Sequence, residues 1–353
     1  MKPWMKNVRQ VEPYVPGEQP KALNVTKLNT NENPYPPAPG VAEKLMQIQA
    51  NHLRRYPDPN CGVLVSALAE YYQVPKERMF VGVGSDDVLA MAFMTFFNSD
   101  KPILFPDISY AFYEVWADMF RIPFEKQLVD AEFRLVKEDY YKENGGVIFP
   151  NPNAPTSLYV PLEAVEEIVR ANPSSVVIVD EAYIDFGGES AMKLTEKYDN
   201  LLVVQTFSKS RSLAGMRIGF AIGHEDLIQA LNSVKFSFNS YTMNETALLL
   251  GAEAVRDEAY FQNTIQKIIA ARNEAEERLQ SLGFTFPKPM GNFIFATHKT
   301  LPAAELFQAL READIYVRYF NKPRIDNYLR ITVGTPEQME VLYRFVEDYQ
   351  AAR

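Results

Sequence analysis

A lysine, two hydroxyl side chains and two arginines stand close together between two apolar runs of the chain. The apolar runs predict strands, so Lys209 lies in the loop that joins them. Its amine should lose a proton more readily than usual, because the positive charges of Arg211 and Arg217 disfavour its charged form. A neutral amine can form a Schiff base, and Thr206, Ser208 and Arg217 could hold a phosphate group. A solvated surface loop is the alternative for this segment taken alone.

The segment at 206–220 reads Thr-Phe-Ser-Lys-Ser-Arg-Ser-Leu-Ala-Gly-Met-Arg-Ile-Gly-Phe. It resembles the lysine segment of the fold type I aminotransferases, which use pyridoxal 5'-phosphate (PLP), and it is most similar to their histidinol-phosphate aminotransferase branch. Further matches follow in the family's order from Tyr14 to Thr335, nearly the whole chain. The resemblance implies that Lys209 forms a Schiff base with PLP and then acts as the general base of a ping-pong transamination.

An aspartate ends the apolar run at 175–179, which is typical of a strand covered on both faces. A carboxylate buried at such a strand end needs a cationic partner, and the protonated ring nitrogen of PLP would be one. The sequence Asp-Glu-Ala-Tyr that starts here resembles the family's, which implies that Asp180 pairs with the ring nitrogen. Tyr183 would then donate a hydrogen bond to the phenolic oxygen of the cofactor. An aspartate that caps the next turn is the alternative.

A glycine-rich turn joins a predicted strand to a predicted helix at 79–97. Backbone amides at the start of a helix can bind an anion. The match to the family's Gly-x-Gly-Ser-Asp implies a phosphate cradle at Gly84, Ser85 and Asp86, in which the amides face the phosphate and the carboxylates of Asp86 and Asp87 turn away. Asp87 stands where a dinucleotide-binding fingerprint would have its last glycine, which argues against a nucleotide-dependent dehydrogenase.

Three further cofactor contacts follow from the resemblance. Tyr110 matches the aromatic residue that stacks on the pyridine ring, although a packed core aromatic is the alternative. Tyr56, in Arg-Tyr-Pro, matches a tyrosine that reaches the cofactor phosphate of the neighbouring subunit, which implies a homodimer with shared sites. The loop at 151–157 departs from the family's Asn-Pro-x-Asn-Pro-Thr-Gly, because Ala154 replaces the asparagine that binds the phenolic oxygen. We expect Asn153, one residue earlier, to take that role.

Four residues match family positions near the substrate: Tyr14, Asn292, Arg318 and Arg330. The resemblance implies that Arg330 grips the acidic group of the substrate, whereas surface ion pairs are the alternative for both arginines. The implied reaction converts L-histidinol phosphate and 2-oxoglutarate into imidazole acetol phosphate and L-glutamate. An aromatic amino acid aminotransferase and a PLP-dependent decarboxylase of an amino-acid phosphate use the same parts and stay open.

The fold implied by the resemblance is an α/β fold of the fold type I PLP-transferases. A mixed, mostly parallel seven-stranded sheet with helices on both faces would form the large domain, over 36–265. A proline-rich N-terminal arm would precede it at 1–35, and a small α/β C-terminal domain would follow at 266–353. The helical pattern across 242–282 is too long for one helix, and we expect a break at 257–260.

The composition limits the kinds of partner. The 353 residues are 47% hydrophobic and 23% charged, an ordinary globular composition, and 36 basic against 45 acidic residues give a net charge of −9. This charge argues against nucleic acid and anionic membranes, and residues 1–30 are too short and too proline-rich for the DNA-binding extension of a PLP-binding regulator. Cys61 is the only cysteine, no apolar run is long enough to span a membrane, and the start lacks a signal-like core. We expect a cytoplasmic enzyme without a metal site.

Overall fold

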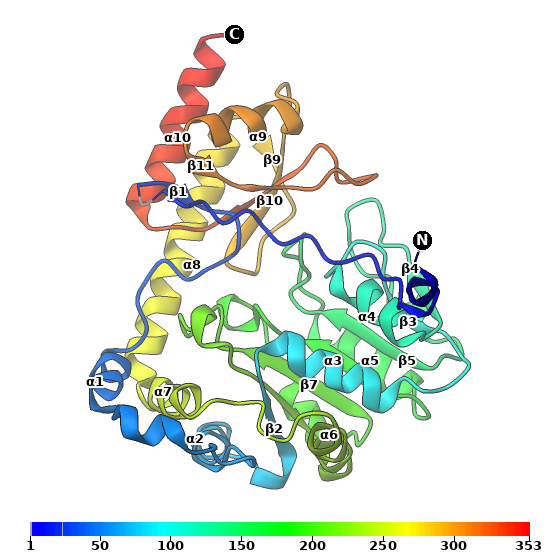
Figure 1. The fold of residues 1–353 in the computed structure, drawn as a ribbon. Helices are drawn as coiled ribbons and strands as arrows, with labels where there is room; N and C mark the ends of the chain where they lie inside the picture. Colours follow the sequence, from blue (N-terminus) through cyan, green and yellow to red (C-terminus); the bar gives the residue numbers. More distant parts are fainter. Residues whose placement is uncertain (1, 23) are drawn as a thin grey trace.

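The structure is a computed structural model that describes residues 2–22 and 24–353 (Figure 1). Its centre is a seven-stranded sheet in the order β2-β8-β7-β6-β5-β3-β4. Strand β8 runs antiparallel to both of its neighbours, and all the other pairs are parallel. The strands are β2 (Met79–Gly82), β3 (Ile103–Pro106), β4 (Phe124–Gln127), β5 (Gly146–Pro150), β6 (Val177–Asp180), β7 (Leu201–Thr206) and β8 (Gly219–Gly223). The predicted mixed, mostly parallel seven-stranded sheet is confirmed.

Helices cover both faces of this sheet, which explains why its central strands are apolar without alternation. One face packs on α3 (Ser85–Phe96), α4 (Phe112–Phe120) and α6 (Glu225–Phe238) through residues such as Ile178 and Leu202. The other face packs on α5 (Leu162–Ala171) through Val179 and Val203. At the β2–β8 end, α1 (Pro39–Gln47), α2 (Gly62–Tyr72) and α7 (Glu245–Arg256) complete this second layer.

A smaller α/β unit is joined to the large sheet by the long helix α8 (Glu258–Ser281), yellow in Figure 1. The side chain of Asp257 accepts a hydrogen bond from the Tyr260 amide and starts α8, so the predicted break in the helical segment is confirmed. The small sheet has the order β12-β13-β10-β9 and is antiparallel. Its elements are β9 (Phe284–Thr285), β10 (Phe293–His298), α9 (Ala303–Glu312), β12 (Arg318–Tyr319), β13 (Leu329–Thr332) and α10 (Pro336–Ala351).

The N-terminal arm lies against both parts of the molecule. Its strand β1 (Thr26–Lys27) pairs in parallel with β11 (Ile315–Tyr316) of the small unit. From there towards the N-terminus, the chain crosses to the neighbourhood of α4 and β4 (Figure 1). Within 2–22 and 24–353, no helix combines the length and the apolar character that a membrane crossing needs.

Candidate active site

A cavity of about 550 Å³ opens where the carboxyl ends of β5, β6 and β7 meet the arm and the small unit. Crevices at the carboxyl ends of parallel strands are the usual ligand sites of α/β folds. Most of the sequence-predicted site residues line it: Tyr14, Ser85, Asp86, Tyr110, Asp180, Tyr183, Thr206, Ser208, Lys209, Arg217, Arg318 and Arg330. Residues from six separate segments of the chain, between Tyr14 and Arg330, are therefore brought to one cavity.

The amine of Lys209 is set up to lose its proton. Its Nζ donates a hydrogen bond of 2.9 Å to the carbonyl oxygen of Thr30. Burial lowers the pKa of Lys209 to about 8, with a second contribution from the positive charge of Arg330 and a smaller one from Arg217. The prediction that Arg211 acts on this amine is wrong, because the Arg211 guanidinium turns into the protein and donates to the Ala254 carbonyl oxygen at 2.9 Å.

A buried carboxylate faces the same cavity. Asp180 ends β6, and its Oδ2 accepts a hydrogen bond of 2.8 Å from the hydroxyl of Tyr113. Burial raises the pKa of Asp180 to about 6, although the Tyr113 hydrogen bond acts against this shift. Within the described part of the chain, Asp180 forms no ion pair. The carboxylate is thus available to a cation that a ligand would bring.

Tyr113 was missed by the sequence reasoning. It lies three residues after Tyr110, in the first turn of α4, and its ring is fully buried. Spacing of three places two side chains on the same side of a helical turn, which is the local signal that could have found it. Nothing in the sequence near Tyr113 indicates that its partner is a carboxylate on β6.

Two glycines shape the turn before α3. Gly84 has φ of +84°, a conformation that suits glycine, and a Cβ there would lie 2.5 Å from Nη2 of Arg217. Gly219 starts β8, and a Cβ there would lie 2.3 Å from the amide nitrogen of Ser85. The glycines therefore let the Arg217 guanidinium and strand β8 approach the N-terminus of α3, where free amides and the helix dipole favour an anion.

The two aspartates of this turn behave differently. Asp87 turns away from the cavity as predicted, and its carboxylate accepts a hydrogen bond of 2.9 Å from the Val83 amide. The prediction for Asp86 is wrong, because its carboxylate faces the cavity. It pairs with Nη2 of Arg217 at 3.1 Å and accepts a hydrogen bond of 2.7 Å from the hydroxyl of Tyr110. Asp86 thus positions both a cation and an aromatic ring of the site.

Two hydroxyl groups lie beside that guanidinium. Thr206, the last residue of β7, donates a hydrogen bond of 3.0 Å to Oγ of Ser208, and Ser208 accepts one of 3.3 Å from Nη1 of Arg217. Two hydroxyls, one guanidinium and the start of α3 therefore converge on one end of the cavity. Such a donor set is suited to a phosphate group.

The cavity is also lined by Arg330, a half-buried arginine that has no carboxylate partner among the described residues. Arg330, on β13, donates to the Asn29 carbonyl oxygen at 2.9 Å, and its buried Nε has no hydrogen-bond partner. Burial lowers the pKa of Arg330, since the charged guanidinium is poorly solvated. Arg318 is held instead by the arm, through the carbonyl oxygens of Val15 at 3.0 Å and Pro16 at 3.2 Å. Arg330 therefore lines the cavity with a guanidinium whose charge no described carboxylate neutralises, and this charge can attract an acidic ligand.

An asparagine of the arm organises the third side of the cavity. Asn31 has φ of +56°, and its Nδ2 donates a hydrogen bond of 3.0 Å to the hydroxyl of Tyr183. Thr332 donates to Oδ1 of Asn31 at 3.0 Å, and Asn292 donates to its carbonyl oxygen at 3.0 Å. Asn292 is therefore buried behind the cavity and supports Asn31 without lining the cavity itself. The sequence analysis gave Asn31 no role, and the structure alone shows its contact with Tyr183.

Two predicted cofactor residues do not reach this cavity. Asn153 turns away, and its Nδ2 donates to the Ile108 carbonyl oxygen at 3.0 Å and to Oγ1 of Thr156 at 2.9 Å. Its neighbour Ala154 lines the cavity in its place. Tyr56 is 80% exposed and lies at the surface, outside the set of residues that line the cavity of its own chain.

Comparison with known proteins identifies the family. The family model described as aminotransferase class I and II matches residues 24–346. The chain is 50% identical to a histidinol-phosphate aminotransferase of Clostridium beijerinckii over 339 residues, which is 96% of this chain and 95% of that protein. It is 52% identical to a histidinol-phosphate aminotransferase of Pseudomonas putida over 339 residues, 96% of this chain and 97% of that protein.

A solved structure shares the fold at low sequence identity. The histidinol-phosphate aminotransferase of Sinorhizobium meliloti, in complex with PLP, superposes with a TM-score of 0.82 at 20% identity and covers 91% of each chain. The arrangement of one large mixed sheet and a smaller C-terminal unit is thus that of the fold type I PLP-transferases, as predicted. The match of the family model to most of the chain and the two long alignments at half identity show that this chain belongs to the class I and II aminotransferases.

Proposed function

We propose that the enzyme transfers the amino group of L-histidinol phosphate to 2-oxoglutarate, giving imidazole acetol phosphate and L-glutamate in histidine biosynthesis. The observation that carries the proposal is Arg330, a half-buried arginine that lines the same cavity as Lys209 and has no carboxylate partner among the described residues. The names of the two relatives at 50% and 52% identity support this choice of substrates.

The cofactor is PLP, and the cavity has room and partners for each of its polar groups. The amides before α3, Arg217, Thr206 and Ser208 would hold its phosphate, and the glycine at position 84 keeps that space open. Phosphate binding would draw the Arg217 guanidinium away from its exposed pair with Asp86, since a doubly charged group attracts it more strongly. Asp180, buried and without an ion pair, would hold the protonated ring nitrogen.

Bound PLP would supply the electron sink for the reaction, and the protein would move the protons. Because its pKa is lowered to about 8, the amine of Lys209 loses its proton far more readily than an ordinary lysine, and its Nζ can then accept the proton from the carbon that carries the substrate amine. Tyr183 presents a hydroxyl that Asn31 orients, and it would donate to the phenolic oxygen. These assignments distribute binding, orientation and proton transfer among residues that all line one cavity or support it.

The acidic group of each substrate would bind Arg330. Guanidinium pairs with phosphate and with carboxylate alike, so one arginine can accept histidinol phosphate and then the dicarboxylate 2-oxoglutarate. Arg318 and Tyr14 line the same end of the cavity and would assist. Alternating use of one site by two acids is what a ping-pong exchange requires.

A single half-reaction tests the proposal. The PLP-loaded protein is mixed with L-histidinol phosphate in the absence of any 2-oxo acid, and the visible cofactor band is followed. We expect the band to disappear and to return when 2-oxoglutarate is added. A response only to phenylalanine or tyrosine would support the aromatic aminotransferase instead, and release of CO₂ from L-threonine O-3-phosphate would support the decarboxylase. Lys209→Ala should abolish the change with every donor.

We also propose a homodimer in which Tyr56 reaches the cofactor phosphate of the neighbouring subunit. Large exposed apolar side chains occur on α1 and η2 (Ala50–Arg54), at Leu45, Met46 and Leu53, and on α6 and after it, at Phe236, Phe238 and Tyr241. The Tyr56 and Tyr241 rings lie 4.6 Å apart, so these two regions meet. Exposed apolar surface of this kind favours association with a partner.

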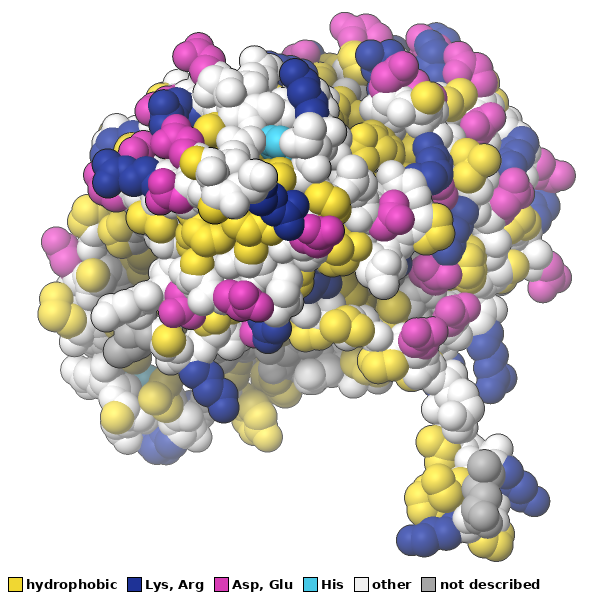
Figure 2. Space-filling view, turned by 90° about the horizontal axis from the view of Figure 1, so that it is seen from above, with side chains coloured by type: hydrophobic (Ala, Val, Ile, Leu, Met, Phe, Trp, Pro, Cys, Tyr) yellow, Lys and Arg dark blue, Asp and Glu magenta, His cyan; other side chains and the backbone are white. Residues whose placement is uncertain are grey.

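The start of the arm supports the same proposal. Its short helix η1 (Pro3–Asn7) has no buried residue, and Figure 2 shows the amino-terminal end standing out from the body of the molecule. Trp4 is 60% exposed, whereas tryptophan side chains are on average well buried. A second subunit would provide that surface. Size-exclusion chromatography with light scattering tests the dimer.

The proposed location is the cytoplasm. Cys61 is the only cysteine and is a buried free thiol, and burial raises its pKa, so it is poorly reactive. A chain without a possible intrachain disulfide suits a reducing compartment. Cell fractionation followed by an activity assay tests the location, and activity confined to a membrane or secreted fraction would contradict it.

A further inference from the structure

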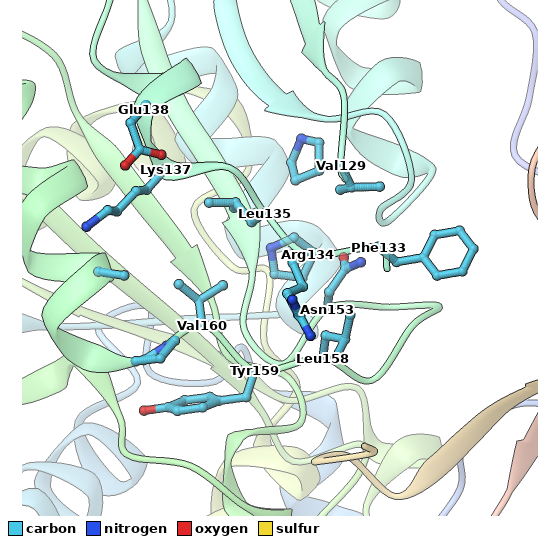
Figure 3. Close-up of a pocket in the computed structure, with 14 residues that line it drawn as sticks. Val129, Phe133, Arg134, Leu135, Lys137, Glu138, Asn153, Leu158, Tyr159 and Val160 are labelled. Atoms are coloured by element: carbon cyan, nitrogen blue, oxygen red, sulfur yellow. The ribbon is translucent and has the colours of Figure 1, made fainter. Parts of the chain in front are cut away.

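The loop at 151–157, which the structure describes in full, gives the phenolic oxygen of PLP no side-chain donor. Ala154 stands where the family segment Asn-Pro-x-Asn-Pro-Thr-Gly has its cofactor-binding asparagine, and it lines the cavity of the candidate active site. Asn153 lines a second cavity instead (Figure 3). The amide of Asn151 donates to the Val160 carbonyl oxygen at 3.0 Å. The contact that the family resemblance assigns to this loop therefore has to come from another part of the chain.

Tyr183 is placed to provide that contact. It lines the cavity, and Nζ of Lys209 lies 5.7 Å from the centroid of its ring. Tyr110 also lines the cavity, but its hydroxyl already donates to Asp86 at 2.7 Å. In PLP, the ring atom that bears the phenolic oxygen is bonded to the ring atom that bears the aldehyde, the group that reacts with the lysine. A donor to that oxygen must therefore lie beside Lys209, as Tyr183 does.

Asn31 limits the direction in which the hydrogen of the Tyr183 hydroxyl can point. Nδ2 of Asn31 donates to the Tyr183 oxygen at 3.0 Å, so the hydroxyl accepts on that side and its own hydrogen is left for another partner. A hydroxyl that accepts a hydrogen bond is also polarised, which makes it a stronger donor. Burial raises the pKa of Tyr183, although the charge of Arg330 and the Asn31 hydrogen bond act against this shift. The hydroxyl therefore keeps its hydrogen and stays a donor.

The orientation of the Asn31 amide is itself determined by Thr332. The backbone amide of Asn31 donates to Oγ1 of Thr332 at 3.0 Å, so the hydrogen of that hydroxyl is free for Oδ1 of Asn31, also at 3.0 Å. Oδ1 therefore faces Thr332, and Nδ2 faces Tyr183. Asn31 is fully buried, and Asn292 donates to its carbonyl oxygen at 3.0 Å. Both ends of the amide and the backbone of Asn31 are thus held in place.

We infer that Asn31 is a positioning residue for the cofactor: it directs the Tyr183 hydroxyl at the phenolic oxygen and so compensates for the donor that position 154 lacks. The charge of the phenolic oxygen then depends on the N-terminal arm, through Asn31, and not on the loop after β5. This inference rests on the proposed contact between Tyr183 and the phenolic oxygen. It does not depend on which amino donor the enzyme uses.

The visible band of the PLP-loaded full chain, titrated with pH in the absence of substrate, measures this effect. A hydrogen bond donated to the phenolic oxygen stabilises its negative charge, so the proton shared by that oxygen and the Lys209 nitrogen is lost at a lower pH. The midpoint of the change in the band reports that pH. Its absolute value also depends on the other titratable groups around Tyr183 and Lys209, which are Glu32, Asp86, Tyr113, Asp180, Arg217 and Arg330. The variants below change none of these groups, so differences between midpoints report the donors.

Three substitutions test the link from Asn31 to Tyr183. Tyr183→Phe removes the donor and should raise the midpoint by about one pH unit. Asn31→Gly removes the amide without adding a charge and suits the φ of +56°, so it should raise the midpoint by at least about half a pH unit. In the Tyr183→Phe background Asn31→Gly should add nothing, because its effect requires the hydroxyl. Thr332→Val removes the hydroxyl that orients the Asn31 amide and should also raise the midpoint.

A restored donor in the loop should have the opposite effect. Ala154→Asn places an amide on the wall of the cavity and should lower the midpoint by about half a pH unit or more. Asn172→Gly, at another buried asparagine that does not line the cavity, is the control and should leave the midpoint unchanged. An unchanged midpoint in Ala154→Asn would overturn the inference that position 154 lacks a donor to the cofactor.

The outcomes distinguish this inference from the proposed function, because the titration contains no amino donor. A shift in Tyr183→Phe without one in Asn31→Gly or Thr332→Val would leave the Tyr183 contact standing and overturn the role of Asn31. The full Asn31→Gly shift in the Tyr183→Phe background would also overturn that role, because Asn31 would then act through another group. An unchanged midpoint in Tyr183→Phe would remove the contact itself and overturn both assignments.

Discussion

The hydroxyl of Tyr113 donates a hydrogen bond of 2.8 Å to Oδ2 of Asp180, and both side chains are buried. The contact joins the first turn of α4 to the end of β6, 67 residues apart. A buried carboxylate prefers to be protonated, whereas a hydrogen bond donated to its charged form opposes protonation. The balance of these two effects sets the pKa of Asp180, and therefore how much of it is charged and able to pair with a cationic ring.

Removal of that hydroxyl should make Asp180 harder to ionise. In Tyr113→Phe, the pKa of Asp180 should rise further above its present value of about 6, because burial then acts with less opposition. PLP affinity needs the charged carboxylate, so its loss on acidification should start about one pH unit or more higher than in the wild type. Titration of PLP at several pH values measures this. Tyr140→Phe, at another buried tyrosine, is the control, and coincident pH profiles would contradict the prediction.

The lowered pKa of Lys209 should make the stability of the PLP-free protein depend on pH. Lys209 has its pKa lowered from 10.5 to about 8, so between these values the unfolded chain holds a proton that the folded chain has lost, and stability rises with pH. Below pH 8 Lys209 is protonated in the folded protein too, and its poorly solvated charge then lowers the free energy of unfolding. Lys209→Met should therefore be more stable than the wild type below pH 8, and this advantage should shrink towards pH 10.5.

Urea unfolding of the PLP-free proteins at neutral and basic pH measures that difference. Lys76→Met, at an exposed lysine, serves as the control and should show no such trend. An advantage of Lys209→Met that stays constant with pH would mean that the amine is not titrating in this range.

The cradle before α3 should tolerate no side chain at Gly219. In Gly219→Ala, the new Cβ would lie 2.3 Å from the Ser85 amide nitrogen, so the turn must shift and its amides move away from the phosphate. We expect PLP affinity to fall at least about tenfold. At Gly40, which does not line the cavity, a Cβ would meet only the flexible side chain of Glu253, so Gly40→Ala is the control. Similar PLP dissociation constants for both variants would contradict the cradle.

Loss of the Arg330 guanidinium should affect both half-reactions. Arg330→Gln should lower kcat/KM for L-histidinol phosphate and for 2-oxoglutarate by at least about thirtyfold, because the acidic group of either substrate loses its half-buried cationic partner. Arg318→Gln should cost less than about tenfold, since two carbonyl oxygens of the arm already occupy that guanidinium. The reverse order of the two effects would move the acid site to Arg318.

Mixed dimers should reveal whether Tyr56 acts across the interface. Tyr56→Ala and Lys209→Ala are each expected to be poorly active at limiting PLP. If Tyr56 of one subunit serves the other, a mixed dimer has one site with both defects and one intact site. Mixing the variants under exchange conditions should then restore activity, with each variant alone as the control. Failure to recover activity in verified mixed dimers would assign Tyr56 to its own subunit or to no site.

The sequence by itself determined the strands and the identity of the principal chemical groups. Apolar runs that end in Asp180 and before Lys209 are local patterns of the sequence. Strands of a parallel sheet that are buried on both faces need such runs, so both strand ends could be located without a structure. Gly84 was also readable, because a strand-to-helix turn with a free helix N-terminus favours a glycine, whereas the role of Gly219 came only from the structure. The family resemblance then added the roles of these groups.

Only the tertiary structure decided how the side chains of the loops are directed and which distant residues they meet. Arg330, 121 positions after Lys209, affects the amine, whereas Arg211, two positions after it, is buried against α7. Asn153 faces one cavity and Ala154 the other, although they are adjacent. The physical reason is that regular elements fix side-chain direction by their period, while in a loop each residue's φ and ψ, and the partners that satisfy its polar atoms, set that direction separately.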